Sequence, residues 1–163
     1  MSTTTPDLTY FANYTAICRD LAESSNGYWQ SRWKHIPDDK LNWSPGGKAK
    51  TPLQIAAHVA VSNELFALCL SGNPPVEGGF PELFAWMGEQ EATLTTREMV
   101  EARAQNAISS LLKTLEHIPA EVVATNEDAK FYVGLVGRHI MDHAGQLDAY
   151  QLMWGDDDFH FEG

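Results

Sequence analysis

The sequence contains few cysteines and few basic residues, and each shortage argues against a class of protein. The two cysteines, Cys18 and Cys69, lie far apart and form no CxxC arrangement, so we expect two reduced, packed thiols. Basic residues number 11 against 22 acidic ones, which gives a formal net charge of -11. An acidic chain repels phosphate backbones and anionic membrane surfaces, so neither nucleic acid nor a membrane is expected as a partner.

The sequence also shows no long apolar run and no recognisable targeting segment. No run of 18 or more apolar residues is found, which argues against a transmembrane helix. The opening stretch, MSTTTPDLTYFANY, lacks the basic and then apolar order of a secretory signal. We therefore expect a cytoplasmic protein, and the length of 163 residues predicts a single domain over residues 1–163.

Strand-like alternation is absent over any useful length, and helical periodicity takes its place. Four long amphipathic helices are predicted, which favours an all-α fold, a four-helix bundle. A short extra helix is predicted at residues 81–89, inside the long connection between the second and third helices. The expected long helices run from near Asp7 to just before Pro37, from Pro52 to about Leu70, from Thr95 to about His117, and from between Glu127 and Lys130 to Gly155.

Local signals support several of these boundaries. Thr51 followed by Pro52 reads as an N-cap with proline at the first helical position. Thr95 and Glu98 have the spacing of a capping box. In the first helix, one apolar stripe is formed by Tyr10, Tyr14, Ile17, Leu21 and Tyr28, and beside it lie Phe11, Cys18, Ala22 and Trp29.

The last helix carries two histidines, His139 and His143, on a face that is otherwise mostly apolar. Residues four apart on a helix are neighbours, so both imidazoles can bind one metal ion. A pair with this spacing is more often two packed or polar histidines than a metal site. Buried imidazoles nevertheless need partners, and a divalent cation would satisfy their lone pairs.

A third histidine, His58, lies in the second helix among small apolar residues. Three histidines from two helices would leave coordination positions open for water or substrate, as in catalytic metal sites. Imidazole ligands favour zinc or nickel here, with iron, manganese and copper as alternatives. His35, His117 and His160 lie near helix ends or in the tail, and no catalytic role is expected for them.

Two stretches, LNWSPGGKAKTPLQIAAHVAVSNELF and VGRHIMDHAGQLDAYQLMWG, together resemble the DinB-like, or YfiT-like, metalloenzyme superfamily. The resemblance extends over essentially the whole chain. It rests on Trp43-Ser44-Pro45, then His58, then His139 and His143 followed by Gly145 and Gln146. Each motif is short, but the set in this order is fairly specific.

The resemblance implies a four-helix bundle with a divalent metal bound by His58, His139 and His143. It also implies a homodimer, as in many members. Characterised members include thiol-dependent S-transferases and isomerases that use low-molecular-weight thiols such as mycothiol or bacillithiol. A small-molecule substrate, one of these thiols among the candidates, is therefore an expected partner.

Further side chains are candidates for contact with the metal or the substrate. Gln146, one turn past His143, would hold a metal-bound water or orient substrate; it could equally be a satisfied buried amide. Gly145 indicates close helix packing or a tolerated glycine. No carboxylate is expected to complete the site as a general base, because Glu64 should point to another face. Candidate substrate contacts, with plain core packing as the other reading of the aromatic ones, are Gln54, Tyr150, Trp43 and Tyr14.

Two functions remain open from the sequence. The first is a metal-dependent enzyme that activates water or a thiol, as a hydrolase or a thiol S-transferase would. The alternative is a non-catalytic metal-binding or stress-related protein whose site has no turnover. Exposed aromatic side chains, with Trp29, Trp33 and Trp86 as examples, are candidates for the interface of a homodimer.

Overall fold

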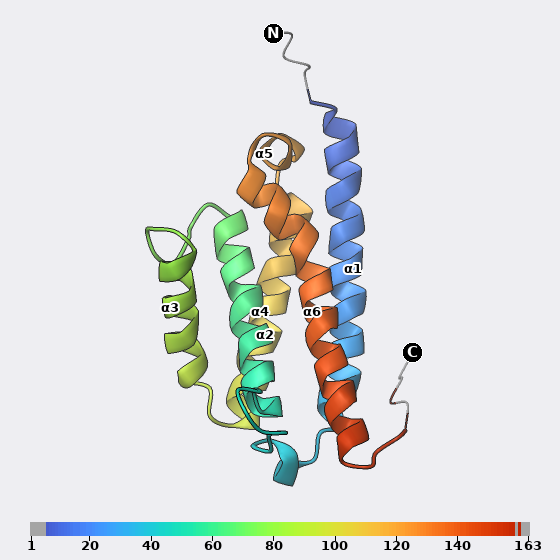
Figure 1. The fold of residues 1–163 in the computed structure, drawn as a ribbon. Coiled ribbons are helices and arrows are strands. Elements are labelled where there is room, and N and C mark those ends of the chain that lie inside the picture. Colours follow the sequence, from blue (N-terminus) through green and yellow to red (C-terminus); the bar gives the residue numbers. More distant parts are fainter. Residues whose placement is uncertain (1–5, 159, 161–163) are drawn as a thin grey trace.

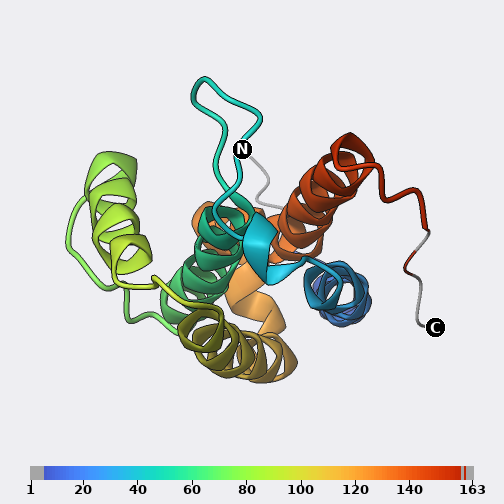
Figure 2. The same ribbon diagram turned by 90° about the horizontal axis from the view of Figure 1, so that it is seen from below.

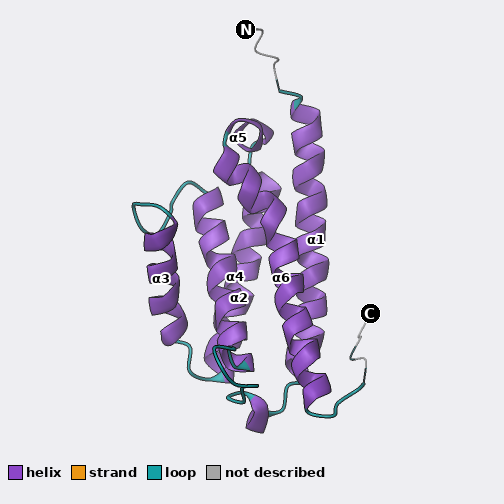
Figure 3. Ribbon diagram, viewed as in Figure 1, coloured by secondary structure: helices purple, strands orange, loops and turns teal. Residues whose placement is uncertain are grey.

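The computed structural model describes residues 6–158 and residue 160, and every regular element among them is helical (Figure 3). The all-α fold predicted from the periodicity is therefore confirmed. A short 3-10 helix at Asp38–Lys40 and six α-helices follow one another along the chain. The α-helices are α1 (Leu8–Lys34), α2 (Pro52–Leu70), α3 (Phe80–Ala92), α4 (Arg97–His117), α5 (Ala120–Thr125) and α6 (Glu127–Met153).

The four long helices, α1, α2, α4 and α6, form the bundle (Figures 1 and 2). In the view of Figure 1, α1 and α6 run downward side by side, whereas α2 and α4 run upward side by side. Helix α3 lies outside the bundle against α2 and returns the chain to the lower end, so that α4 can run parallel to α2. The connection that the sequence left open is thus a crossover, and the short α5 covers the upper end.

Capping explains where the second bundle helix begins. The Thr51 hydroxyl accepts the Gln54 backbone N–H, and the Gln54 side-chain oxygen accepts the Thr51 N–H in return. This reciprocal pair satisfies two amide groups that the first turn leaves without partners. At α4 the N-cap is Thr96, whose hydroxyl accepts the Met99 N–H. The prediction of Thr95 as the cap was wrong by one residue.

The buried face of helix α1 is not the predicted tyrosine-containing stripe that begins at Tyr10. Its core-facing side includes small side chains, Cys18, Ala22 and Ser25, and these allow close approach to α6. A Cβ atom on Gly137 of α6 would lie only 2.6 Å from the Leu21 Cγ atom. Tyr10, by contrast, is exposed, and so are Ile17 and Leu21. Close helix packing at small residues, rather than side-chain size, therefore decides which face of α1 is buried.

Two further expectations are corrected by burial. Trp29 and Trp33 are only 4% and 6% exposed, so they belong to the core and cannot form a surface for a partner. Gly145 has open space where a Cβ atom would lie, so close packing does not account for it. Among the described residues, α2 is the one helix long and apolar enough to cross a membrane, and 72% of its apolar window is buried inside the bundle.

Candidate metal centre

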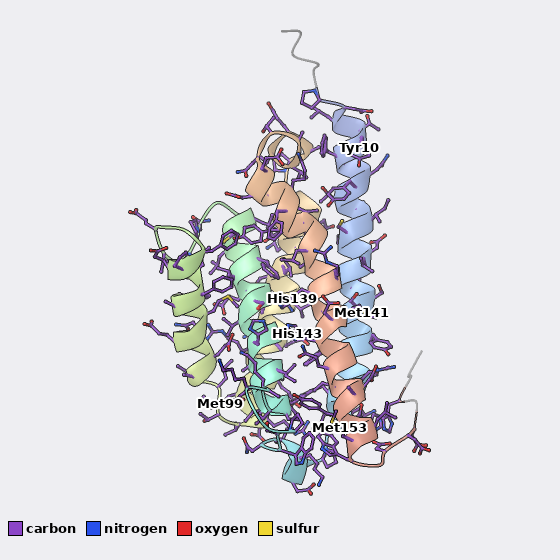
Figure 4. The ribbon with its side chains drawn as sticks, viewed as in Figure 1. Tyr10, Met99, His139, Met141, His143 and Met153 are labelled. Carbon is purple, nitrogen blue, oxygen red and sulfur yellow. The ribbon has the colours of Figure 1, made fainter. Side chains whose placement is uncertain are left out.

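The three predicted histidines converge between α2 and α6. His139 and His143 project from successive turns of α6 toward α2, near the middle of the bundle (Figure 4). The Nε2 atom of His139 lies 3.3 Å from Nε2 of His58 and 3.2 Å from Nε2 of His143. All three ligand atoms lie within 4.8 Å of one another. The structure therefore brings together the set that the sequence proposed.

Two of the separations between the ring nitrogens match tetrahedral coordination of one cation. Metal–nitrogen bonds of about 2.0–2.1 Å place two tetrahedral ligands about 3.3–3.4 Å apart. The two measured Nε2–Nε2 separations are 3.3 and 3.2 Å. These three imidazoles can hold a divalent cation and leave at least one coordination position open. We conclude that the donor set and its geometry fit a metal.

Neighbouring acceptors determine which nitrogen of two rings carries the proton. Nδ1 of His58 lies 2.7 Å from Oε1 of Glu91, and Nδ1 of His143 lies 3.0 Å from Oε1 of Gln146. A carboxylate and an amide oxygen only accept hydrogen bonds, so each Nδ1 must donate. In their neutral form, both rings then direct the Nε2 lone pair toward the centre. Two lone pairs directed at one centre are well placed to bind a cation there.

Burial keeps the imidazoles in the form that binds metal. It lowers the pKa of His139 to about 3, and the proximity of His143 and His58 acts in the same direction. Burial also lowers the pKa of His143 below its ordinary value. A histidine must be neutral to bind a metal ion. These two rings are already neutral at pH 7, so metal binding there releases no proton from them.

Glu91 is the site residue that the sequence reasoning missed. No carboxylate was expected to complete the site as a general base, and Glu64 indeed points elsewhere and pairs with Arg103, but Glu91 joins the site as the partner of His58. Helix α3 extends to Ala92, three residues beyond the predicted end at residue 89, and this last turn carries Glu91 to His58. The pairing spans 33 positions of sequence, and no local spacing signals it.

Glu91 also forms an ion pair with Lys50, so its carboxylate connects Lys50 to His58. Its Nζ atom lies 2.6 Å from the second carboxylate oxygen, Oε2. Burial would raise the pKa of Glu91, but hydrogen bonds from His58 and Lys50 outweigh it and hold that pKa below the ordinary value. Glu91 is therefore an anion over the range in which most proteins work, and it can orient His58 and strengthen it as a ligand.

Of the other residues predicted for the site, some lie beside the histidines or the Lys50 loop and one lies elsewhere. Gln146 is exposed and accepts from His143, as described. The Tyr150 hydroxyl donates to the Lys50 backbone carbonyl at 2.8 Å. Trp43 packs edge-on against Tyr150 with ring centroids 5.4 Å apart. These two aromatic residues thus anchor the loop that carries Lys50. Tyr14 lies elsewhere, with its hydroxyl against Gly134 on the α1–α6 seam.

A polar cavity of about 560 Å³ adjoins this network between the 42–50 loop, α2 and α3. Its lining includes Lys48, Lys50, Gln54 and Glu91. Gln54 therefore combines its capping role with a position on the cavity wall. Two lysines at the rim supply positive charge in a chain that is otherwise strongly acidic. The cavity can accept a small polar molecule beside Glu91, the hydrogen-bond partner of His58.

The all-helical bundle and its three convergent imidazoles place this protein in the class of candidate helical metalloproteins. The family model for the DinB superfamily matches residues 23–147, a stretch that contains all three histidines and Glu91. The chain therefore belongs to the DinB superfamily, as its motifs indicated. A search of curated proteins and a search of solved structures each returned no match.

Proposed function

We propose that this protein is a metal-dependent enzyme with a divalent cation bound by His58, His139 and His143. The observation that carries the proposal is the convergence of three imidazoles, with Nε2 of His139 at tetrahedral spacing from Nε2 of both His58 and His143. Bound there, the cation would lower the pKa of a water or thiol ligand and make it a nucleophile near neutral pH. Zinc and nickel suit three imidazoles best, with iron, manganese and copper as alternatives.

The chain's own residues would prepare and restrict the reaction. Glu91 and Gln146 fix the orientation of His58 and His143 through the Nδ1 hydrogen bonds. Lys48 and Lys50 line the polar cavity and would attract an anionic substrate. A low-molecular-weight thiol with carboxylate groups has this character, which supports thiol transfer as the first reaction to test. Hydrolysis is the second, since the same centre would activate water.

Activity assays on loaded and metal-free protein test this function. The protein would be stripped with a chelator, reloaded with zinc or nickel, and assayed for thiol addition to a chromogenic electrophile and for ester hydrolysis. We expect turnover that requires metal and that is lost in His143→Ala. The exposed His117→Ala variant is the matched control, and it should retain full activity.

The alternative, a metal-binding protein without turnover, predicts a different result. In that case the loaded wild-type protein would bind metal stoichiometrically and yet react no faster than His143→Ala in either assay. Stoichiometric binding without catalysis would overturn the enzymatic proposal and retain the metal site. No binding of any of the candidate metals would overturn both.

We also propose that the protein forms a homodimer through the outer face of α1 and α6. Tyr10, Ile17 and Leu21 are exposed along α1, and Met141 is exposed on the neighbouring α6 (Figure 4). Burying such an apolar stripe against a second copy would remove it from water. Ile17→Glu should give a monomer by light scattering, whereas Leu152→Glu, equally exposed at the end of α6, should not. A monomeric wild-type protein at high concentration would refute the proposal.

A further inference from the structure

A second cavity lies beside the histidines, and unlike the polar cavity described above it is mostly apolar. It has a volume of about 170 Å³ and lies between α2, α3 and α6. His58 and His139 are part of its wall, and most of the remaining lining is apolar, with Leu65, Phe66 and Leu135 as examples. The Phe66 ring packs edge-on against His139 with centroids 5.5 Å apart. The cavity is therefore bordered by two of the three candidate ligand residues.

Helix α3 forms the outer wall of this cavity. Leu83 and Met87 are its two buried side chains and hold it against the bundle. Phe80 and Phe84, on the same face, stack with centroids 6.1 Å apart, yet they are 53% and 63% exposed. Phe131 of α6 lines the cavity as well and is also exposed. Three phenylalanines from two helices thus form an apolar rim that the fold itself does not bury.

Two residues that line this apolar cavity each carry a buried polar atom without a partner. Ser62 is 1% exposed, and its hydroxyl has no hydrogen-bond partner among the described residues. Nδ1 of His139 is buried and likewise has no partner in the described part of the chain. Both residues line the cavity. Buried polar groups nearly always have partners, and both of these atoms belong to residues of the cavity wall.

From these observations we infer that the substrate carries an apolar group about the size of one phenyl ring, which binds in this cavity. Its polar, reacting end would reach the three histidines from there. The size follows from the volume, since an apolar protein cavity of about 150 Å³ accepts benzene. Mostly apolar walls with a few polar groups are typical of small-molecule sites. The inference rests on the proposed function, because it concerns the substrate of that same centre.

Hydroxamates are suitable probes, because the hydroxamate group binds the metal ion and the substituent can be varied. We would measure by calorimetry the binding of acetohydroxamate, benzohydroxamate and phenylacetohydroxamate to the zinc- or nickel-loaded protein. The better of the two phenyl compounds should bind about 10- to 100-fold more tightly than acetohydroxamate, the factor expected when one phenyl ring is buried.

A variant that fills the cavity provides the decisive comparison. Leu135→Trp should remove the preference for phenyl and leave acetohydroxamate binding unchanged. Leu152→Trp, on the same helix but at an exposed position outside the cavity lining, should keep the preference. If Leu135→Trp does not fold, Phe84→Ala at an exposed rim position should reduce the preference several-fold.

The outcomes separate this inference from the proposed function. Equal affinities for all three hydroxamates in the wild-type protein, or a preference that survives Leu135→Trp, would overturn the apolar subsite and leave the metal centre in place. Protein that binds neither metal nor any hydroxamate would overturn the proposed function and the inference together.

Discussion

Replacing Glu91 by glutamine removes one negative charge beside the candidate metal centre, and with it the ion pair to Lys50, but nearly preserves the shape of the side chain. The carboxylate lies 2.7 Å from Nδ1 of His58, and its side chain is only 18% exposed. Glutamine has nearly the same shape and can still accept the hydrogen bond through its amide oxygen. The variant therefore tests the negative charge rather than the packing of α3 against α2.

The magnitude follows from the kind of hydrogen bond that is lost. Hydrogen bonds to charged groups contribute about 1.5–3 kcal/mol, against about 0.5–1.5 kcal/mol for neutral ones. The difference, about 1 to 1.5 kcal/mol, corresponds to roughly tenfold in an equilibrium constant. Loss of an outer-shell partner of a metal ligand typically weakens metal binding about 10- to 100-fold. We therefore expect Glu91→Gln to bind metal about tenfold more weakly, and Glu91→Ala up to about 100-fold.

Competition against a chromophoric chelator measures this change directly. Glu89→Gln is the matched control, since Glu89 lies on the same helix, is exposed, and loses the same charge on substitution. Its affinity should stay within about twofold of wild type, because exposed charges are screened by solvent. Equal affinities of Glu91→Gln and wild type, or equal losses in both variants, would refute the role given to the Glu91 carboxylate.

Two further predictions concern stability. The pKa of His139 falls from 6.5 to about 3 on folding, so the unfolded chain binds a proton between these values that the folded chain does not. The metal-free protein should lose stability as the pH falls below 6.5, by about 1 kcal/mol per pH unit. Urea unfolding at pH 7, 6 and 5 should show this slope. His139→Gln should reduce it, leaving the part that comes from His143, whereas the exposed His117→Gln should not; an unchanged slope in His139→Gln would contradict the assignment. For the glycines of α6, Gly137→Ala would place Cβ 3.0 Å from a backbone atom of α1 and should destabilise the fold by about 1–3 kcal/mol. Gly145→Ala meets nothing and should stabilise it by roughly 0.5–1 kcal/mol; thermal melts that rank the pair in the opposite order would refute the packing described for α1 and α6.

The bundle could be predicted from the sequence because its information is local. Periodicity marks the four long helices, and a cap at Thr51 followed by Pro52 places the start of α2 correctly. The four-residue spacing of His139 and His143 puts both rings on one helix face, wherever that helix packs. His58 could be added because small neighbours indicated an inward-facing stripe.

The parts that were missed depend on contacts between distant segments. Glu91 reaches His58 only because α3 folds back along α2, and nothing within α3 itself specifies that contact. The exposed face of α1 was also misjudged, because Tyr10 and Ile17 resemble core residues but are exposed, whereas the smaller Cys18 and Ala22 beside them are buried. Tertiary packing, rather than side-chain hydrophobicity alone, determined the outcome at both places.

A crystal structure of the zinc- or nickel-loaded protein, with anomalous scattering recorded at the metal's absorption edge, tests the central claim most directly. We predict one anomalous peak per chain, about 2.0–2.1 Å from the Nε2 atoms of His58, His139 and His143, with Glu91 still bonded to Nδ1 of His58. A peak bound by other residues, or no peak in crystals of fully loaded protein, would contradict the account.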